Sequence, residues 1–151
     1  MSYTQKEYDE FANRMETQFP KLFGQGGYGG FAVGPGWWPI LESLCGRINS
    51  HVEWKQNQLE KYQRGEGCPD VIVSQIKEKF GGLRFYYDGG DDTVDGMVRM
   101  AESWAAQTCE ECGKPGTMRT GGWIRTLCDE HEAQRQETMR QREMNISGLE
   151  E

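Results

Sequence analysis

Hydrophobic residues recur at helical spacing at the start of the chain. Four such positions lie three or four residues apart, so they share one face of a helix. They are Tyr8, Phe11, Met15 and Phe19. Thr4 is suited to cap this helix and Pro20 ends the run, so we expect a helix over residues 4 to 19. The stripe is more typical of a core-facing helix than of a partner surface.

A second helical pattern begins at Trp37–Trp38–Pro39 and continues to Arg64–Gly65. Proline suits the first turn because its missing N–H would have no partner there. The apolar positions are Ile40, Leu41, Leu44, Ile48, Val52, Leu59 and Tyr62. The pattern is long for one helix, and Gly46 or Asn49–Ser50 are the candidate breaks. His51 lies near the apolar face, where a lone histidine is more often structural than functional.

Residues 23 to 37 connect these two helical patterns and contain seven glycines. Glycine loses the most backbone entropy on ordering, so we expect no regular structure here. The glycines do not match a nucleotide-binding P-loop. The segment is either a connector whose aromatic side chains pack on the core or a loop that approaches a ligand.

Two β-rich runs, residues 71 to 80 and 83 to 87, flank Gly81–Gly82. A tight primed turn needs positive φ at both central positions, so the pattern predicts an antiparallel hairpin with the two glycines at its turn. Alternation places Arg84 and Tyr86 on the same face of the second strand.

A third helix is expected over residues 93 to 108, after a cap supplied by residues 89 to 92. Its side chains at helical spacing form a stripe that we expect to be buried. These are Val94, Met97, Val98, Ala101, Trp104 and Ala105. This helix leads directly to Cys109.

Two ligand pairs of the same spacing follow this helix. Cys109 and Cys112 form the first pair, Cys128 and His131 form the second, and each pair encloses two residues. Zinc takes four such sulfur and nitrogen ligands in structural sites. We therefore predict a structural Zn²⁺ site, with no coordination position left for catalysis. The alternative is a redox pair of Cys109 and Cys112, which leaves the second pair unexplained.

The order of elements around these ligands resembles a treble-clef zinc finger. Gly113 follows a tight knuckle, and short strands are expected at residues 117 to 120 and 123 to 127 around Gly121–Gly122. Cys128 and His131 then occupy the first turn of a polar helix, whose positive end favours a thiolate.

The composition of the chain argues against several classes of protein. The net charge of −7 argues against non-specific nucleic-acid binding. No apolar run is long enough to span a membrane, and the first residues lack the apolar region of a signal peptide. An odd number of cysteines, five, then fits a reducing cytoplasm. Cys45 and Cys68 stand alone and are expected to be structural thiols.

An enzyme is not favoured. His51 and His131 are the two histidines in the sequence, and His131 is assigned to the metal, which argues against a histidine-based nuclease. Asp70 and Gln75 imitate a nuclease motif but fall on opposite faces of one extended strand. We assign no catalytic residue.

Two stretches interleave basic and aromatic residues, residues 77 to 87 and 119 to 125. Arginine beside aromatic rings is suited to stacking and to pairing with anions. The simpler interpretation is that the aromatic residues are core and the basic ones solvate the sheet. The candidate residues for binding a ligand or partner are Arg84, Tyr86, Lys79, Tyr28, Trp37, Trp123 and Arg125.

The segments GWWPILESLC, QIKEKFGGLRFYY and CEECGKPGTMRTGGWIRTLCDEH resemble parts of small proteins encoded by bacteriophages and prophages. The resemblance covers residues 35 to 131 and supplies no catalytic residues. It implies a protein that acts on host machinery or host defence, by binding a host protein or by sequestering a nucleotide.

We therefore expect an α+β fold, with N-terminal helices on a small antiparallel sheet and a C-terminal zinc lobe. Residues 1–108 would form the main domain, 109–143 the lobe and 144–151 a flexible tail. The expected function is non-enzymatic binding of a host factor through the aromatic and basic surface, with the effect of countering host defence. The alternatives are a nucleotide-binding protein and a nucleic-acid-binding or nuclease-accessory protein.

Overall fold

The computed structural model describes residues 2–149. Helix α1 (Gln5–Gln18) begins with a capping box, in which the Thr4 side chain accepts from the Glu7 N–H and Glu7 accepts from the Thr4 N–H. Phe11 and Met15 are buried on its inner face, as the stripe predicts. A short helix, α2 (Pro20–Phe23), follows directly.

The glycine-rich segment is more ordered than expected. It contains strand β1 (Phe31–Ala32) and the 3-10 helix η1 (Pro35–Trp37). β1 pairs in parallel with β2, with Phe31 opposite Ile76. The Phe31 ring packs 4.9 Å from that of Phe11 and 5.3 Å from that of Phe23, measured between centroids. Aromatic packing therefore offsets the entropic cost of ordering the glycines.

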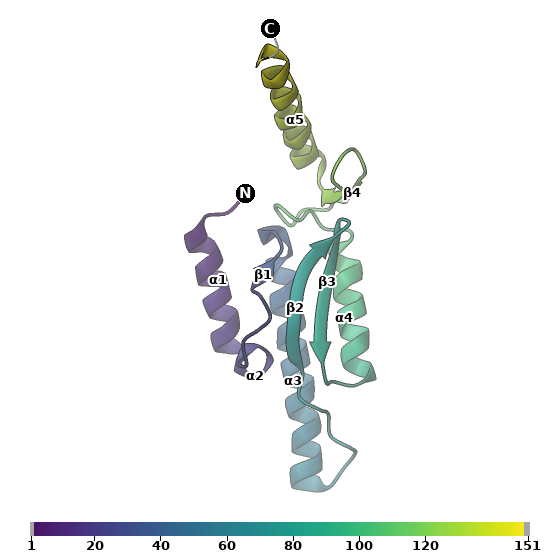
Figure 1. The fold of residues 1–151 in the computed structure, drawn as a ribbon. Coiled ribbons are helices and arrows are strands. Elements are labelled where there is room, and N and C mark those ends of the chain that lie inside the picture. The colour runs from purple at the N-terminus through teal and green to yellow at the C-terminus, as the bar shows by residue number, and fades with distance from the viewer. Residues whose placement is uncertain (1, 150–151) are drawn as a thin grey trace.

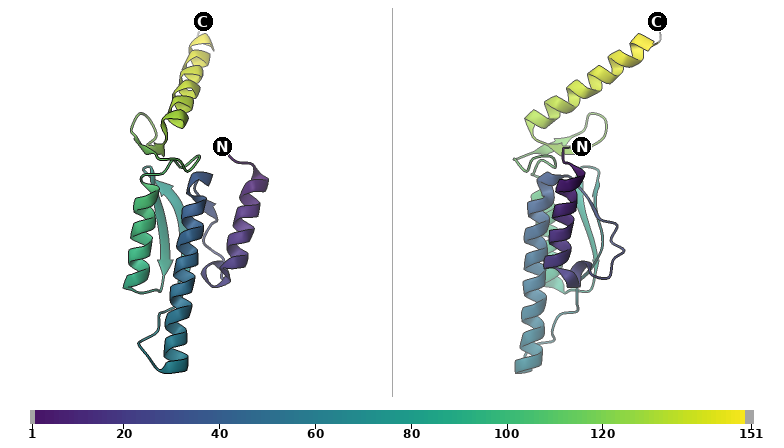
Figure 2. Two further views of the ribbon diagram at one scale, coloured as in Figure 1. Left: turned by 180° about the vertical axis from the view of Figure 1, so that it is seen from behind. Right: turned by 90° about the vertical axis from the view of Figure 1, so that its left-hand side faces the viewer.

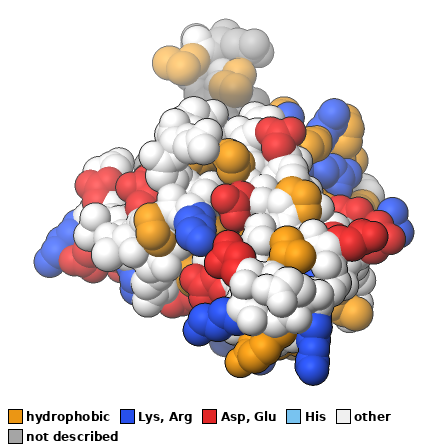
Figure 3. All heavy atoms as spheres, turned by 90° about the horizontal axis from the view of Figure 1, so that it is seen from below, with side chains coloured by type: hydrophobic (Ala, Val, Ile, Leu, Met, Phe, Trp, Pro, Cys, Tyr) orange, Lys and Arg blue, Asp and Glu red, His pale blue; other side chains and the backbone are white. Residues whose placement is uncertain are grey.

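Helix α3 (Trp38–Tyr62) runs without a break, so the candidate breaks at Gly46 and Asn49–Ser50 are not used. Its first half buries one face against the core, from Ile40 to Val52. Its second half extends beyond the sheet (Figure 1), and Trp54 and Tyr62 are 58% and 57% exposed there. Figure 3 looks onto this end of the molecule, where acidic and basic side chains are interspersed.

The main sheet has the order β1-β2-β3 and is mixed, because β1 is parallel to β2. β2 (Ile72–Lys79) and β3 (Gly82–Asp88) form the predicted antiparallel hairpin. The turn lies one residue earlier than predicted. Lys79 pairs with Gly82, so the central residues are Phe80 and Gly81, with φ of 52° and 79°.

Helices α3 and α4 (Asp92–Ala105) cover one face of this sheet (Figure 2). Leu83 and Phe85 point into the core between sheet and helices, whereas Tyr86 on the opposite face is 42% exposed. α4 buries four residues of its predicted stripe, Val94, Val98, Ala101 and Ala105. Trp104 was expected in that stripe but is 50% exposed, at the edge of the α3–α4 contact.

The C-terminal lobe contains strands β4 (Thr117–Arg119) and β5 (Arg125–Leu127) and helix α5 (Asp129–Leu149). The α+β class is thus confirmed. α5 projects away from the rest of the molecule (Figure 1) and has no buried residue over its described length. A flexible tail was predicted from residue 144, but the helix continues to Leu149; residues 150–151 lie outside the described range. Within residues 2–149, none of the helices is long and apolar enough to cross a membrane.

Candidate metal centre

The four predicted ligands converge at the junction of α4, the β4–β5 hairpin and α5. Their donor atoms all lie within 4.8 Å of one another. Cys112 Sγ is 3.8 Å from Cys128 Sγ, and His131 Nδ1 is 3.6 Å from Cys109 Sγ and 3.2 Å from Cys128 Sγ. A tetrahedral zinc ion would separate its sulfur ligands by about 3.8 Å and a sulfur from a nitrogen by about 3.6 Å. The cluster is therefore compatible with one four-coordinate ion.

A tight turn positions the first pair of ligands. The Cys109 N–H donates to Lys114 O at 2.8 Å, and the Gly113 N–H donates to Cys109 O at 2.9 Å. Gly113 has φ of 80°, a conformation that other residues adopt only with strain. The glycine after the second ligand is therefore a requirement of this turn.

The start of α5 positions the second pair of ligands. The His131 backbone N–H donates to Cys128 Sγ at 3.5 Å. This hydrogen bond lowers the pKa of the Cys128 thiol to about 7. Because the thiolate is the form that binds a metal, the helix start prepares Cys128 for coordination. Cys109 is fully buried and Cys128 is 7% exposed, whereas Cys112 faces solvent.

The glycine-rich segment holds the metal lobe against the main domain. The Gly36 N–H donates to Glu110 O at 2.7 Å, and the Trp37 indole N–H donates to Thr108 O at 2.9 Å. A Cβ on Gly36 would lie 2.0 Å from Cys109 O, so a larger residue would separate the two segments. The backbone of Gly36 therefore closely approaches the turn that carries Cys109 and Cys112.

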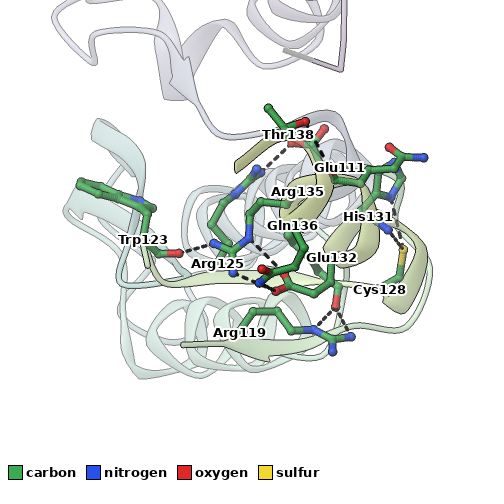
Figure 4. A network of polar contacts seen from close by, with 12 residues as sticks. Glu111, Arg119, Trp123, Arg125, Cys128, His131, Glu132, Arg135, Gln136 and Thr138 are labelled. Carbon is green, nitrogen blue, oxygen red and sulfur yellow. Dashed lines mark hydrogen bonds and ion pairs between the residues drawn. The ribbon is translucent and has the colours of Figure 1, made fainter. Parts of the chain in front are cut away.

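A polar network lies beside Cys128 and His131 (Figure 4). Arg125 contacts Glu111 at 2.7 Å and Glu110 at 3.3 Å. Burial raises the pKa of Glu110, although the Gly34 N–H and Arg125 both favour its charged form. Arg125 was predicted to bind a partner, and in the structure it joins two acidic side chains beside the metal centre.

A second part of this network ties α5 to the hairpin (Figure 4). Arg135 on α5 contacts Glu132 at 3.0 Å and donates to Trp123 O. Arg119 donates to Leu127 O and contacts Asp129 at 2.8 Å. These contacts fix the start of α5, where His131 lies, relative to β4 and β5.

Two of the residues predicted to bind a ligand lie in the core. Trp37 is fully buried and Tyr28 is 8% exposed, with its hydroxyl bonded to Glu16. Both aromatic rings contribute to packing, so neither offers a surface to a partner. Tyr28 and Trp37 were predicted to bind a ligand or partner, and the structure instead buries both side chains in the core.

The predicted residues of the sheet remain accessible on the face opposite the helices. Tyr86 is 42% exposed, with the Lys77 ammonium 5.7 Å from its ring centroid. Arg84 is half-buried on the same face, and Lys79 is exposed at the end of β2.

The structure also joins the two basic and aromatic stretches, which are far apart in the sequence. The Thr126 hydroxyl donates to Gly81 O at 2.7 Å, so the turn of the β2–β3 hairpin contacts β5. Phe80 and Trp123 are 65% and 75% exposed and line one hollow of about 230 Å³ with Gly122 and Ile124. We name Phe80, Trp123 and Ile124 the hairpin-tip surface. Sequence analysis missed Phe80, although a phenylalanine at a turn was an available signal.

The chemistry of the metal centre follows from its ligands. Cys109, Cys112, Cys128 and His131 could hold one metal ion with four protein ligands, a donor set typical of structural rather than catalytic sites. No family model matches the chain, and neither a curated protein nor a solved structure matches it.

Proposed function

We propose that the four-ligand centre holds structural Zn²⁺ and that the lobe is a zinc finger of the treble-clef type. Three cysteines and one histidine are a preferred zinc set. The order of turn, hairpin and ligand-bearing helix supports the treble-clef assignment. Elemental analysis should find at least about one zinc per chain, since a structural site of this kind binds its ion tightly.

We propose further that the protein is a non-enzymatic binding protein whose partner is another protein. The observation that carries this proposal is the hairpin-tip surface, where Phe80 and Trp123 stand exposed around one hollow. Exposed aromatic residues with cationic neighbours are typical of the residues that dominate binding energy at protein interfaces. Lys79 and Tyr86 on the adjoining sheet face extend the surface.

The proposed partner is a host factor, and the proposed effect is to counter host defence. This part rests on the resemblance of three segments to phage-encoded proteins. An acidic chain that presents an aromatic and basic surface suits a protein partner better than bulk nucleic acid. In this account the zinc lobe has no catalytic role and holds Trp123 beside Phe80. The expected location is the host cytoplasm.

The test is affinity capture from a bacterial host lysate with a matched control. The double variant Phe80→Asn, Trp123→Ala removes both rings, and asparagine tolerates the positive φ at position 80. Trp54→Ala is the control, because Trp54 is 58% exposed on α3. The double variant should retain at least about tenfold less of each partner protein than the wild type and the Trp54→Ala control do. A loss of this size is typical of interface hot spots. Equal retention by all three would contradict the proposal.

The second candidate function is binding of a small anionic ligand, such as a nucleotide. The observation that favours it is a cleft beside the metal centre. The cleft has a volume of about 430 Å³, and its polar lining includes Arg125, Arg135 and Arg142 together with Glu111, Ser2 and Thr138. Guanidinium groups suit phosphate. Nucleotide binding measured by calorimetry should weaken in Arg142→Ala, because Arg142 is exposed on α5 and its loss should leave the fold intact. Absence of binding by the wild type would exclude this candidate.

A further inference from the structure

A second group of side chains that could hold a metal ion lies at the far end of the sheet from the four-ligand centre. It consists of His51, Cys68 and Asp91, whose donor atoms all lie within 4.8 Å of one another. His51 belongs to α3, Cys68 precedes β2, and Asp91 is the N-cap of α4. Three separate segments therefore bring a nitrogen, a sulfur and an oxygen donor to one place.

The backbone around these residues is held in a close-packed arrangement. The Gly90 N–H donates to Pro69 O at 3.1 Å, and the Gln56 side chain donates to Cys68 O at 2.7 Å. Gly89 has φ of 81°, and a Cβ there would lie 1.9 Å from Asp70 O. The segments that carry Cys68 and Asp91 are thus fixed relative to each other and to α3.

Both oxygens of the Asp91 carboxylate lie close to His51, and Oδ1 is 3.1 Å from His51 Nε2. Oδ1 accepts from the Val94 N–H at 3.1 Å and caps α4. Oδ2 lies 2.8 Å from His51 Nε2. Tetrahedral zinc would place a nitrogen and an oxygen ligand about 3.4 Å apart, so these two atoms would have to separate by about half an ångström. Oδ1 can keep its bond to the helix while Oδ2 binds a metal.

The exposure of the three side chains indicates where a fourth ligand would enter. Cys68 is 1% exposed, whereas the side chains of His51 and Asp91 are 14% and 27% exposed. The group is closed on the thiol side and open to solvent on the other. Zinc sites with three protein ligands leave the fourth position to water, unlike fully liganded structural sites.

We propose that His51, Cys68 and Asp91 form a second site for a divalent ion of the zinc class, with one coordination position open to solvent. Thiolate and imidazole ligands favour zinc over the oxygen-preferring magnesium and calcium. The site would differ from the four-ligand centre in being accessible to a small ligand. The competing explanation is an ion pair between His51 and Asp91 that caps α4 without metal, with the buried Cys68 thiol beside the Asp91 carboxylate.

The test measures bound zinc per chain after saturation and removal of excess metal. We expect about two equivalents for the wild type and about one for Asp91→Asn and for Cys68→Ser, because each variant removes an anionic ligand. Asparagine can still cap α4 at position 91, so this variant should retain its fold. Cys45→Ser is the control, because Cys45 is a buried cysteine of α3 outside both groups, and it should keep about two equivalents.

Cobalt provides an independent measurement on the same proteins. The first equivalent of Co²⁺ should give the charge-transfer absorption of three thiolates, and the second should add about one third of that intensity, from Cys68 alone. Saturation of the wild type at one zinc would overturn the proposal. So would two equivalents in Asp91→Asn and Cys68→Ser, since the second ion would then lie elsewhere.

Discussion

The main domain and the C-terminal lobe differ in how much core each possesses. In residues 11 to 105, buried side chains from α1 to α4 and all three strands form one continuous hydrophobic cluster. The described part of the lobe has a cluster of three residues, Cys109, Leu127 and Cys128, and two of these are candidate metal ligands. A small core cannot offset the entropy of ordering a chain. If the four-ligand centre holds zinc as proposed, metal coordination does in the lobe what hydrophobic packing does in the main domain.

The largest effect should come from the ligand Cys112, which is exposed and contributes little packing. Cys112→Ser should remove zinc from the lobe, and with it on the order of 10 kcal/mol of metal-binding free energy. We expect rapid proteolysis within residues 109–149 and an intact fragment of the main domain. Met118→Ala, an exposed change in the same lobe, should resemble the wild type. A protease-resistant Cys112→Ser lobe would argue against the metal's role.

The second-largest effect should be the loss of stability caused by a substitution in the core of the main domain. Trp37 is fully buried, so Trp37→Ala should cost about 3–5 kcal/mol in urea denaturation. It should also loosen the lobe, because the indole N–H bonds to Thr108 O. Trp54→Ala, on the exposed end of α3, should change stability by less than about 0.5 kcal/mol. Similar losses of unfolding free energy in Trp37→Ala and Trp54→Ala would contradict the packing assigned to Trp37.

An intermediate effect should test the contact between the two regions. Thr126→Val keeps the shape of the side chain but leaves Gly81 O without its donor, at a cost of about 1–3 kcal/mol. Thr138→Val is the control, since its hydroxyl bonds within the exposed part of α5. Thermal unfolding of both variants measures the difference. Equal melting temperatures would show that the hairpin contact contributes nothing.

The smallest effect should be a pH dependence within the main domain. Burial and the hydrogen bond to Asp95 raise the pKa of Tyr87 to about 12. A raised folded-state pKa stabilises the fold fully below the unfolded value of 10.0, and this contribution is lost as pH rises through 12. Tyr87→Phe should therefore be slightly less stable than the wild type at pH 7, with the gap closing at strongly alkaline pH. A stability difference between the wild type and Tyr87→Phe that grows at alkaline pH would contradict the raised pKa of Tyr87.

The features that sequence analysis predicted correctly depend on local spacing. The ligand pairs, the capped first helix and the alternation around Arg84 are set by residues a few positions apart. The errors concern long-range packing. Trp37 and Tyr28 lie in a glycine-rich segment whose composition is typical of a binding loop. Contacts with residues distant in the sequence bury both side chains. The bond between Thr126 and Gly81 O, which forms the hairpin-tip surface, spans 45 positions and leaves no periodic signal.

The turn of the β2–β3 hairpin shows the same limit on a smaller scale. Two adjacent glycines favour a turn centred on both, yet the register places Phe80 at its first central position with φ of 52°. The pairing of Ile76 with Phe85 and of Lys77 with Arg84 fixes this register and keeps Leu83 and Phe85 in the core. Burial along the whole hairpin thus outweighs the local strain of one phenylalanine.

Hydrogen exchange with and without a zinc chelator tests most directly the claim that metal takes the place of a core in the lobe. We predict that chelation removes amide protection from the β4–β5 hairpin and the start of α5, while β2, β3 and the first half of α3 keep theirs. Protection of the lobe should return when zinc is added back. Unchanged protection of the lobe after complete zinc removal would contradict the claim, as would simultaneous loss of protection in both regions.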